Sequence, residues 1–242
     1  IAALTVQNNP FWVDVTKGIE AAKAALAGDD YHTTVDMITV DDFDGQVFAE
    51  TIDTCIVKGY DAITTVGVSD AIVPAIDKAT QSGIPVYVFN SDTEKESKRV
   101  AFVGQDLYAA GGVAADTAAA LIGEKGKVGI ITGLYSVNAH ELRRHGIEDT
   151  IKESYPDIEI VGTTENHDSA DEAYTQTKDF ITGNPDLSAI LVTAGGPHGA
   201  AKAIEELGMQ DQIKLVCFDT TTEIVSYVRK GIINGTVSQD PF

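Results

Sequence analysis

The 242-residue sequence has little sulfur and few large aromatic residues: two cysteines, two methionines and one tryptophan. Two cysteines are too few for a disulfide framework. Cys55 falls in a helical pattern and Cys217 in a strand-like run, so we expect both to be buried free thiols. No run of about 18 apolar residues occurs, and no segment is therefore expected to insert into a membrane.

Positive charge is also scarce. Lys and Arg total 17 against 37 Asp and Glu, for a formal net charge of −20. A chain this acidic repels phosphate backbones and anionic lipid surfaces, which argues against nucleic acid and membranes as partners. Solubility alone also explains such acidity.

Several catalytic and cofactor motifs are missing. The first strand-like run is followed by Asn8-Asn9-Pro10 and not by a glycine-rich phosphate loop, and Gly195–Gly199 lacks the dinucleotide spacing. No Gly-x-Ser-x-Gly elbow offers an activated serine. His140 and His145 are five residues apart, so their imidazoles diverge on a helix and do not form a zinc pair. We expect no metal, no cofactor and no enzymatic activity.

Short apolar runs alternate with stretches of helical periodicity. Between the runs, apolar residues step by three and four, as in Val15, Ile19, Ala22 and Leu26. This alternation predicts βαβ units and therefore parallel sheets flanked by helices. The runs are Ile1–Val6, Thr33–Val40, Ala62–Val66, Val86–Phe89, Val128–Thr132, Ile158–Val161, Ala189–Thr193 and Leu215–Phe218.

The series breaks once, at the polar segment Asn90–Lys98, and restarts at Val128 after a short run and a small-residue helix. Two βαβ series predict two similar lobes joined near Gly104–Leu107. We expect an N-terminal lobe at 1–105, with 239–242 returning to it, and a C-terminal lobe at 106–238.

Polar and aromatic side chains follow the predicted strands, where ligands bind in open α/β sheets. Amides, carboxylates, one arginine and aromatic rings form the mixture that a sugar needs for its hydroxyls and its C–H faces. The residues are Asn8, Asn9, Phe11, Trp12, Asn90, Ser91, Asp92, Asn138, His140, Arg143, Asn166 to Asp168, Asp219, Gln239 and Asp240.

Each of these positions also has a purely structural interpretation. Asn8-Asn9-Pro10 could form a turn and helix cap, and Phe11 or Trp12 could belong to the lobe core. Asp219 could cap the helix that follows it, and Arg143 could be a solvated helix residue like Arg144. The shared placement at strand ends is what favours a binding site.

Together these motifs resemble the ribose- and galactose-type periplasmic sugar-binding proteins. The resemblance lies in Asn8-Asn9-Pro10-Phe11-Trp12, in Phe89–Asp92 with Ser97–Asp106 and Ala109–Gly111, in Arg143 three residues before Gly146-Ile147, and in Val216–Asp219 and Thr236–Pro241. It extends over essentially the whole chain.

The resemblance implies a type I periplasmic binding protein fold, with two Rossmann-like lobes that close about a hinge on one monosaccharide or polyol. It further implies a periplasmic or extracellular monomer, with a cell-surface lipoprotein as an alternative, that serves an ABC transporter permease or a chemoreceptor. The implied ligand residues are Asn9, Phe11, Trp12, Asn90, Asp92, Arg143, Asp219 and Gln239, with the two aromatic rings sandwiching the sugar. His140, Asp168 and His198 are further candidates.

Three departures from the family pattern suggest a ligand other than ribose or glucose. Ala194-Gly195-Gly196 stands where an asparagine is usual, Val66-Gly67-Val68 lacks a polar residue, and no aromatic residue lies near Asp168. Family members also continue beyond the Gln-Asp-Pro segment, so we expect the full protein to extend past Phe242.

Other functions remain open on this fold. The chain could be the effector-binding domain of a LacI-type repressor, which would need a DNA-binding segment before residue 1. It could be the sensor module of a membrane kinase, which would need a tether after Phe242, or an enzyme, which would consume its ligand.

Overall fold

The computed structural model describes residues 1–6, 10–28, 32–40 and 43–242. They form two compact units. Unit 1 comprises Ile1–Gln105, Val137–Ala139 and Asp240–Phe242, and unit 2 comprises Asp106–Ser136 and His140–Gln239. The grouping differs from the expected lobes at Gln239 and at Val137–Ala139. The latter segment groups with unit 1 because Asn138 donates its backbone N–H to the Val68 carbonyl and its Nδ2 to the Asp92 carbonyl.

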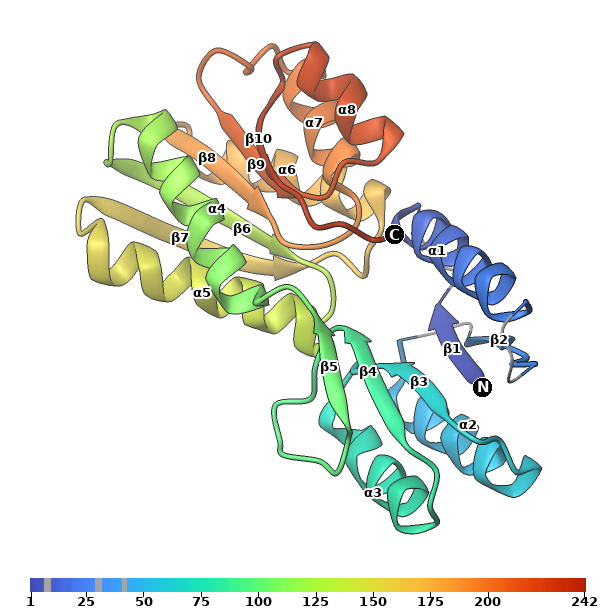
Figure 1. The fold of residues 1–242 in the computed structure, drawn as a ribbon. Coiled ribbons are helices and arrows are strands. Elements are labelled where there is room, and N and C mark those ends of the chain that lie inside the picture. Colours follow the sequence, from blue (N-terminus) through green and yellow to red (C-terminus); the bar gives the residue numbers. More distant parts are fainter. Residues whose placement is uncertain (7–9, 29–31, 41–42) are drawn as a thin grey trace. The chain divides into compact units, whose positions relative to one another are not determined.

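Unit 1 is built on a five-stranded parallel sheet of order β2-β1-β3-β4-β5 (Figure 1). Its helices begin and end at residues suited to those positions: Asp44 caps α2 by accepting from the Gln46 N–H, and Gly59 ends it with a φ of 73°. The strands are β1 (Ala2–Val6), β2 (Asp36–Val40), β3 (Ile63–Val66), β4 (Val86–Asn90) and β5 (Ala101–Gly104); the helices are α1 (Phe11–Leu26), α2 (Gly45–Lys58), the 3-10 turn Asp70–Ile72 and α3 (Val73–Gln81).

Unit 2 repeats this plan. Its parallel sheet has the order β10-β9-β8-β6-β7. The strand order of unit 1 recurs here. β7, the second strand of this unit in sequence, forms one edge and β6, the first, lies next to it, as β2 and β1 do in unit 1. The strands are β6 (Gly126–Thr132), β7 (Ile158–Glu165), β8 (Leu187–Val192), β9 (Lys214–Phe218) and β10 (Ile233–Val237); the helices are α4 (Leu107–Ile122), α5 (Asn138–Ser154), α6 (Ala170–Gly183), α7 (Pro197–Glu206) and α8 (Thr222–Arg229).

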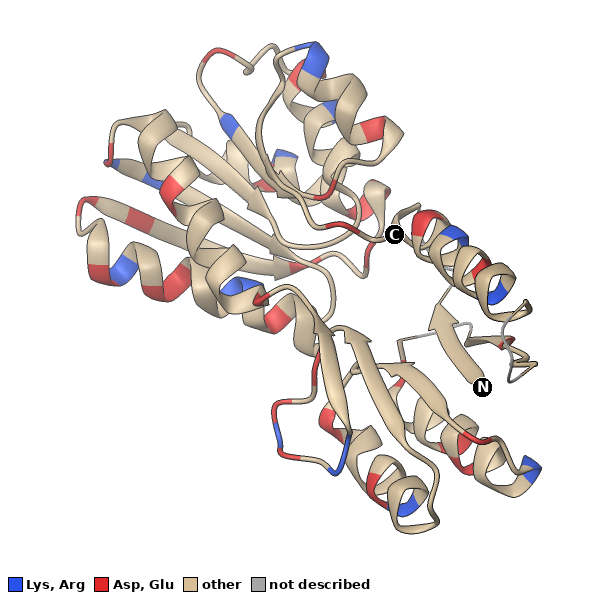
Figure 2. Cartoon of the chain, viewed as in Figure 1, with Lys and Arg blue, Asp and Glu red and all other residues tan. Residues whose placement is uncertain are grey.

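The predicted fold class is therefore confirmed: two parallel α/β sheets of the same topology, each flanked by helices. Within the described residues no helix is long and apolar enough to cross a membrane. Figure 2 shows acidic residues on helices and loops of both units, so the excess negative charge is not confined to one segment.

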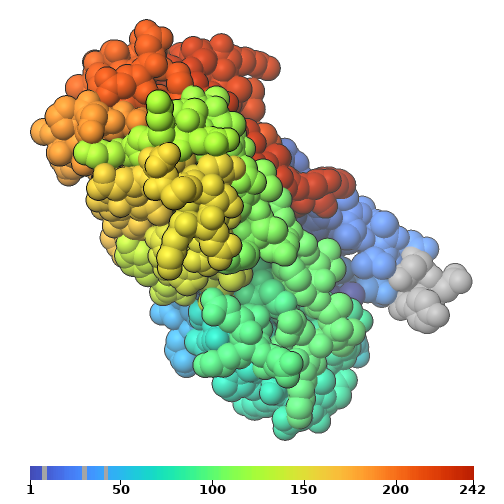
Figure 3. Space-filling view, turned by 90° about the vertical axis from the view of Figure 1, so that its left-hand side faces the viewer, coloured from blue at the N-terminus to red at the C-terminus, as the bar shows by residue number. Residues whose placement is uncertain are grey.

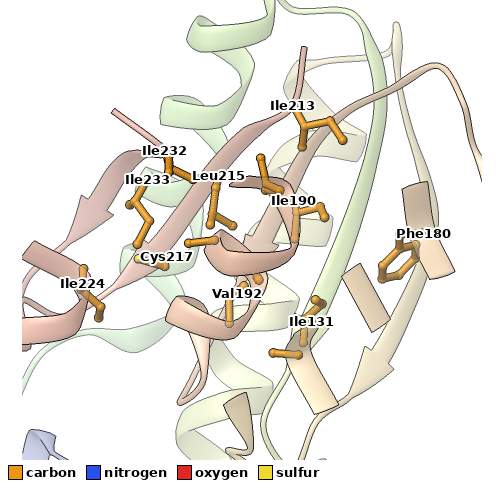
Figure 4. Packing of buried hydrophobic residues seen from close by; sticks show 14 of the residues in the cluster. Ile131, Phe180, Ile190, Val192, Ile213, Leu215, Cys217, Ile224, Ile232 and Ile233 are labelled. Carbon is orange, nitrogen blue, oxygen red and sulfur yellow. The ribbon is translucent and has the colours of Figure 1, made fainter. Parts of the chain in front are cut away.

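The sheet of unit 2 is buried on both faces. Leu215 and Cys217 point into one apolar cluster, while Val216 and Phe218 point into another that includes the alanines of α4. Figure 4 shows the first cluster, where the Cys217 sulfur lies among Ile224, Ile233 and Leu215. Burial on both faces explains why these strands read as continuous apolar runs. Both cysteines are buried and free, as predicted.

Glycines allow α4 and α5 to pack closely. A Cβ at Gly111 would overlap the Arg143 carbonyl oxygen, and a Cβ at Gly146 would overlap the Tyr108 carbonyl oxygen. The green and yellow segments of Figure 3 include this part of unit 2. Because the backbones touch at these points, α5, which carries Arg143, is held against α4, and α4 packs on the sheet through its alanines.

Candidate functional site

Four strands of unit 2 end beside one another, and each end carries a polar residue that is buried or half-buried. Thr132 ends β6, Asn166 follows β7, Thr193 follows β8, and Asp219 follows β9. The first three of these are fully buried. Buried polar side chains are costly unless they find partners, so their concentration at one sheet edge marks a candidate site.

Arg143 projects from α5 into this edge. Its side chain is buried, its Nη1 donates to the Thr193 carbonyl at 2.9 Å, and its guanidinium carbon lies 4.2 Å from the centre of the Phe218 ring. Burial lowers the pKa of this guanidinium while Asp219 and Asp168 raise it. An arginine stays protonated under such shifts, so a full positive charge is held under the strand ends.

The adjacent Arg144 behaves differently. It pairs with Glu141 and Glu148, each at 2.6 Å, along its own helix. The interpretation of Arg143 as a solvated helix residue like Arg144 is therefore wrong. The helical turn places the two arginines on different sides of α5.

Asp168 and Asn166 lie in the loop after β7 and hold the loop after β8 in place by hydrogen bonds to its backbone. Asp168 Oδ1 accepts from the Gly195 N–H at 2.7 Å, and Asn166 Nδ2 donates to the Gly195 carbonyl at 2.9 Å. Asp168 adopts a left-handed conformation with a φ of 57°, which Asp tolerates better than most residues. A side chain at Gly195 would crowd the Asp168 carboxylate, so glycine permits this approach. The Gly-Gly sequence thus allows the two loops to approach each other closely.

His140 is buried beside Asp168. Its Nδ1 accepts from the Leu134 N–H at 2.9 Å, and its Nε2 lies 4.0 Å from Asp168 Oδ1. Burial lowers the pKa of the imidazole and outweighs the attraction of Asp168. The ring is therefore neutral near pH 7 and carries its hydrogen on Nε2.

Asp219 and Gln239 are in contact at the next strand end. Gln239 Nε2 donates to Asp219 Oδ1 at 3.1 Å, and Asp219 has a left-handed φ of 70°. The interpretation of Asp219 as a helix cap is wrong, because Thr221 accepts from the Ile224 N–H at the start of α8. His198, the remaining candidate in this unit, is half-buried in the first turn of α7.

Two candidates of unit 1 lie at the end of β4. Asn90 is left-handed, with a φ of 65°. Asp92 forms a 2.6 Å ion pair with Arg99, and its Oδ1 accepts from the Thr93 N–H. In this structure the Asp92 carboxylate is thus bound to its own loop, which the sequence did not predict.

The aromatic pair of unit 1 does not have the geometry of a sandwich. The Phe11 and Trp12 rings meet edge to face, with centroids 5.3 Å apart and planes at 90°. Trp12 is 3% exposed and packs near Phe43. No sugar ring fits between two rings in contact, so the expected sandwich is corrected to a half-buried Phe11 beside a core Trp12. Asn9 lies outside the described residues.

Thr193 was not among the predicted site residues. It is fully buried, its hydroxyl is 2.9 Å from that of Thr132, and its carbonyl accepts from Arg143. The only sequence signal was its position as the last residue of an apolar run. Within the described part of the chain, no group of three or more His, Cys, Asp or Glu residues is arranged to hold a metal ion.

Comparison with known proteins gives consistent matches. The D-allose-binding periplasmic protein of Escherichia coli is 27% identical over 252 residues, which cover 98% of this chain and 78% of that protein. The D-apiose import binding protein of Actinobacillus succinogenes is 26% identical over 170 residues; the match spans 69% of this chain and only about half, 52%, of that relative.

A solved structure supports the same relationship. The glucose-galactose binding protein of Geobacillus stearothermophilus superposes with a TM-score of 0.89 at 29% identity, covering 99% of this chain and 85% of that one. The family model described as "Periplasmic binding protein domain" matches residues 2–242. The chain therefore belongs to the periplasmic binding proteins, a family that binds solutes.

Proposed function

We propose that this protein captures one monosaccharide or a similar polyol at the carboxyl ends of its strands and releases it chemically unchanged. The observation that carries the proposal is the cluster in unit 2, where the buried Arg143 and Asp168 side chains and the half-buried Asp219 concentrate charge. Charged hydrogen-bonding groups of this kind form the stronger bonds to hydroxyls. The three matched relatives are named for apiose, allose and glucose-galactose, all of which are sugars.

The proposed mechanism is ligand-driven closure. Unit 1 contributes candidates at the end of β4 and the start of α1, and unit 2 contributes Arg143, Asp219 and Gln239. A sugar that binds groups of both units favours the closed form and shifts the population toward it. If the radius of gyration measured by small-angle scattering does not change when the ligand binds, the proposed closure is contradicted.

The proposed partners follow from the family. We propose a periplasmic or extracellular monomer that delivers the sugar to an ABC transporter permease or presents it to a chemoreceptor.

The test is a thermal-shift screen of the purified chain against pentoses, hexoses, inositols, sugar phosphates and amino acids. A ligand that binds only the native state raises the melting temperature by mass action. We expect a shift with one or a few neutral monosaccharides. A shift only with amino acids or phosphates, or consumption of the sugar, would contradict the proposal.

Matched arginine variants locate the binding. Arg143→Ala is expected to abolish the shift, and Arg229→Ala to keep it, because Arg229 is exposed on α8. Both variants remove one positive charge from a helix. Equal effects of the two would show that the sugar does not bind at the strand ends of unit 2.

A further inference from the structure

Of the four buried side-chain atoms of unit 2 that lack a hydrogen-bond partner among the described residues, Thr177 Oγ1 lies in α6 and the other three lie around one short segment. These three are Asp168 Oδ2, Asn166 Oδ1 and Arg143 Nε. The same three side chains bind residues 193–195: Arg143 the Thr193 carbonyl, Asp168 the Gly195 N–H, and Asn166 the Gly195 carbonyl. The unused atoms therefore belong to one cluster.

Two of the three atoms are acceptors. Asn166 Nδ2 donates to two carbonyls, those of Gly195 and Ser169, which identifies the other amide atom as the oxygen. Asp168 Oδ2 belongs to a carboxylate whose side chain is only 8% exposed. A ligand that satisfies this cluster must present more donors than acceptors to it.

The charges of the cluster point the same way. One guanidinium, Arg143, is opposed by two carboxylates, Asp168 and Asp219. His140 adds no positive charge while its Nδ1 accepts from the Leu134 N–H, since a doubly protonated ring could not accept there. The cluster therefore holds an excess of negative charge.

We propose that Asp168 Oδ2 selects the ligand by accepting an O–H or N–H, so that the site takes neutral or amino sugars and rejects the corresponding sugar acids. The inference rests on the proposed function and narrows its substrate class. An anionic carboxylate placed here would meet two unpaired acceptors and an excess of negative charge, and buried like charges repel strongly.

The proposal is tested by calorimetric titration and thermal shift of the purified chain. The probes are D-ribose, D-allose, D-glucose and D-galactose, each with its 2-amino and its uronic acid form. We expect the acid form of any aldose that binds to be at least about tenfold weaker than the neutral form, whereas the amino form retains binding. A uronic acid that binds as tightly as its aldose would overturn the proposal without the use of any variant.

Asp168→Asn isolates the acceptor. Asparagine also tolerates the left-handed backbone, and its Oδ1 can still accept from the Gly195 N–H, while a donor replaces Oδ2. Loss of a hydrogen bond to a charged group predicts an affinity about 10- to 100-fold lower for the neutral sugar. Asp171→Asn, exposed in the first turn of α6, is the matched control with the same change in charge and is expected to bind normally.

The outcomes separate the two proposals. If an aldose binds and Asp168→Asn binds it as well as the control does, the selection by Asp168 is wrong and the sugar-binding function stands. If no pentose, hexose or inositol of the thermal-shift screen binds the unmodified chain, the proposed function fails and this inference fails with it.

Discussion

Two adjacent arginines provide a sharp test of the site. Arg143 and Arg144 occupy the same helix, so replacing either with Met makes the same change in charge and a small change in helix propensity. Their surroundings differ. Arg143 is 5% exposed and bound to a buried carbonyl, whereas Arg144 is half-buried and pairs with two glutamates of its own helix.

The expected magnitudes differ accordingly. Arg143→Met leaves the Thr193 carbonyl without its donor and two carboxylates without their cation. Removing one partner of a buried charged group costs about 3–5 kcal/mol. Arg144→Met removes two helix ion pairs worth about 0.2–1 kcal/mol each. For a chain of this length, 1 kcal/mol lowers the melting temperature by about 2–4 °C, so Arg143→Met is expected to lower it by about 6–20 °C.

The assay is urea unfolding followed by circular dichroism at pH 7, with sugar binding measured on each folded variant. Arg143→Met is expected to lose both stability and binding, and Arg144→Met to lose little of either. A free energy of unfolding for Arg143→Met within about 1 kcal/mol of that for Arg144→Met would refute the account of Arg143 as a buried charge held in a site.

Three further predictions concern packing, protonation and the thiols. Gly146→Ala is expected to destabilise the protein by about 1–3 kcal/mol in urea unfolding, because the added Cβ overlaps the Tyr108 carbonyl oxygen. This cost outweighs the better helix propensity of alanine. Unchanged stability would mean that α4 and α5 can move apart at no cost. Burial lowers the pKa of His140, so below about pH 6.5 the unfolded chain binds more protons than the native one and the free energy of unfolding falls with falling pH. In His140→Asn the free energy of unfolding should fall less between pH 6.5 and 5. If the variant and the unmodified protein lose stability equally over this range, the burial of a neutral ring is contradicted. Burial raises the pKa of Cys217 to about 12, so this thiol should not react with Ellman's reagent at pH 8 until denaturant is added. Rapid reaction of both cysteines in the native protein would contradict their burial.

Much of the fold could be predicted because both sheets are parallel and their central strands are buried on both faces. Such strands are nearly continuous apolar runs, as Leu215–Phe218 illustrates. Strand β10 was not identified as a strand, because Asn234 and Gly235 interrupt its pattern and the register with β9 shifts between Ile233 and Gly235. Strand β7 proved longer than its apolar run, extending through Gly162 to Glu165.

The chemistry of the candidate site could be predicted only in part from the sequence. Strand ends identified Asp168, Asp219 and Arg143 as residue types suited to a polyol, but sequence does not reveal which of two neighbouring arginines is buried. The interaction of Asp92 with Arg99 was missed because it lies in an irregular loop, where no periodicity predicts contacts. The edge-to-face contact of Phe11 with Trp12 depends on side-chain rotamers, which spacing does not specify.

The central claim is that a monosaccharide binds at the strand ends of unit 2, and a crystal structure of the chain with the sugar that gives the largest thermal shift tests it most directly. The account predicts sugar hydroxyls within hydrogen-bonding distance of the Arg143 guanidinium, Asp219 and Asp168 Oδ2. A sugar bound elsewhere, with these three groups still surrounded only by protein and water, would contradict it.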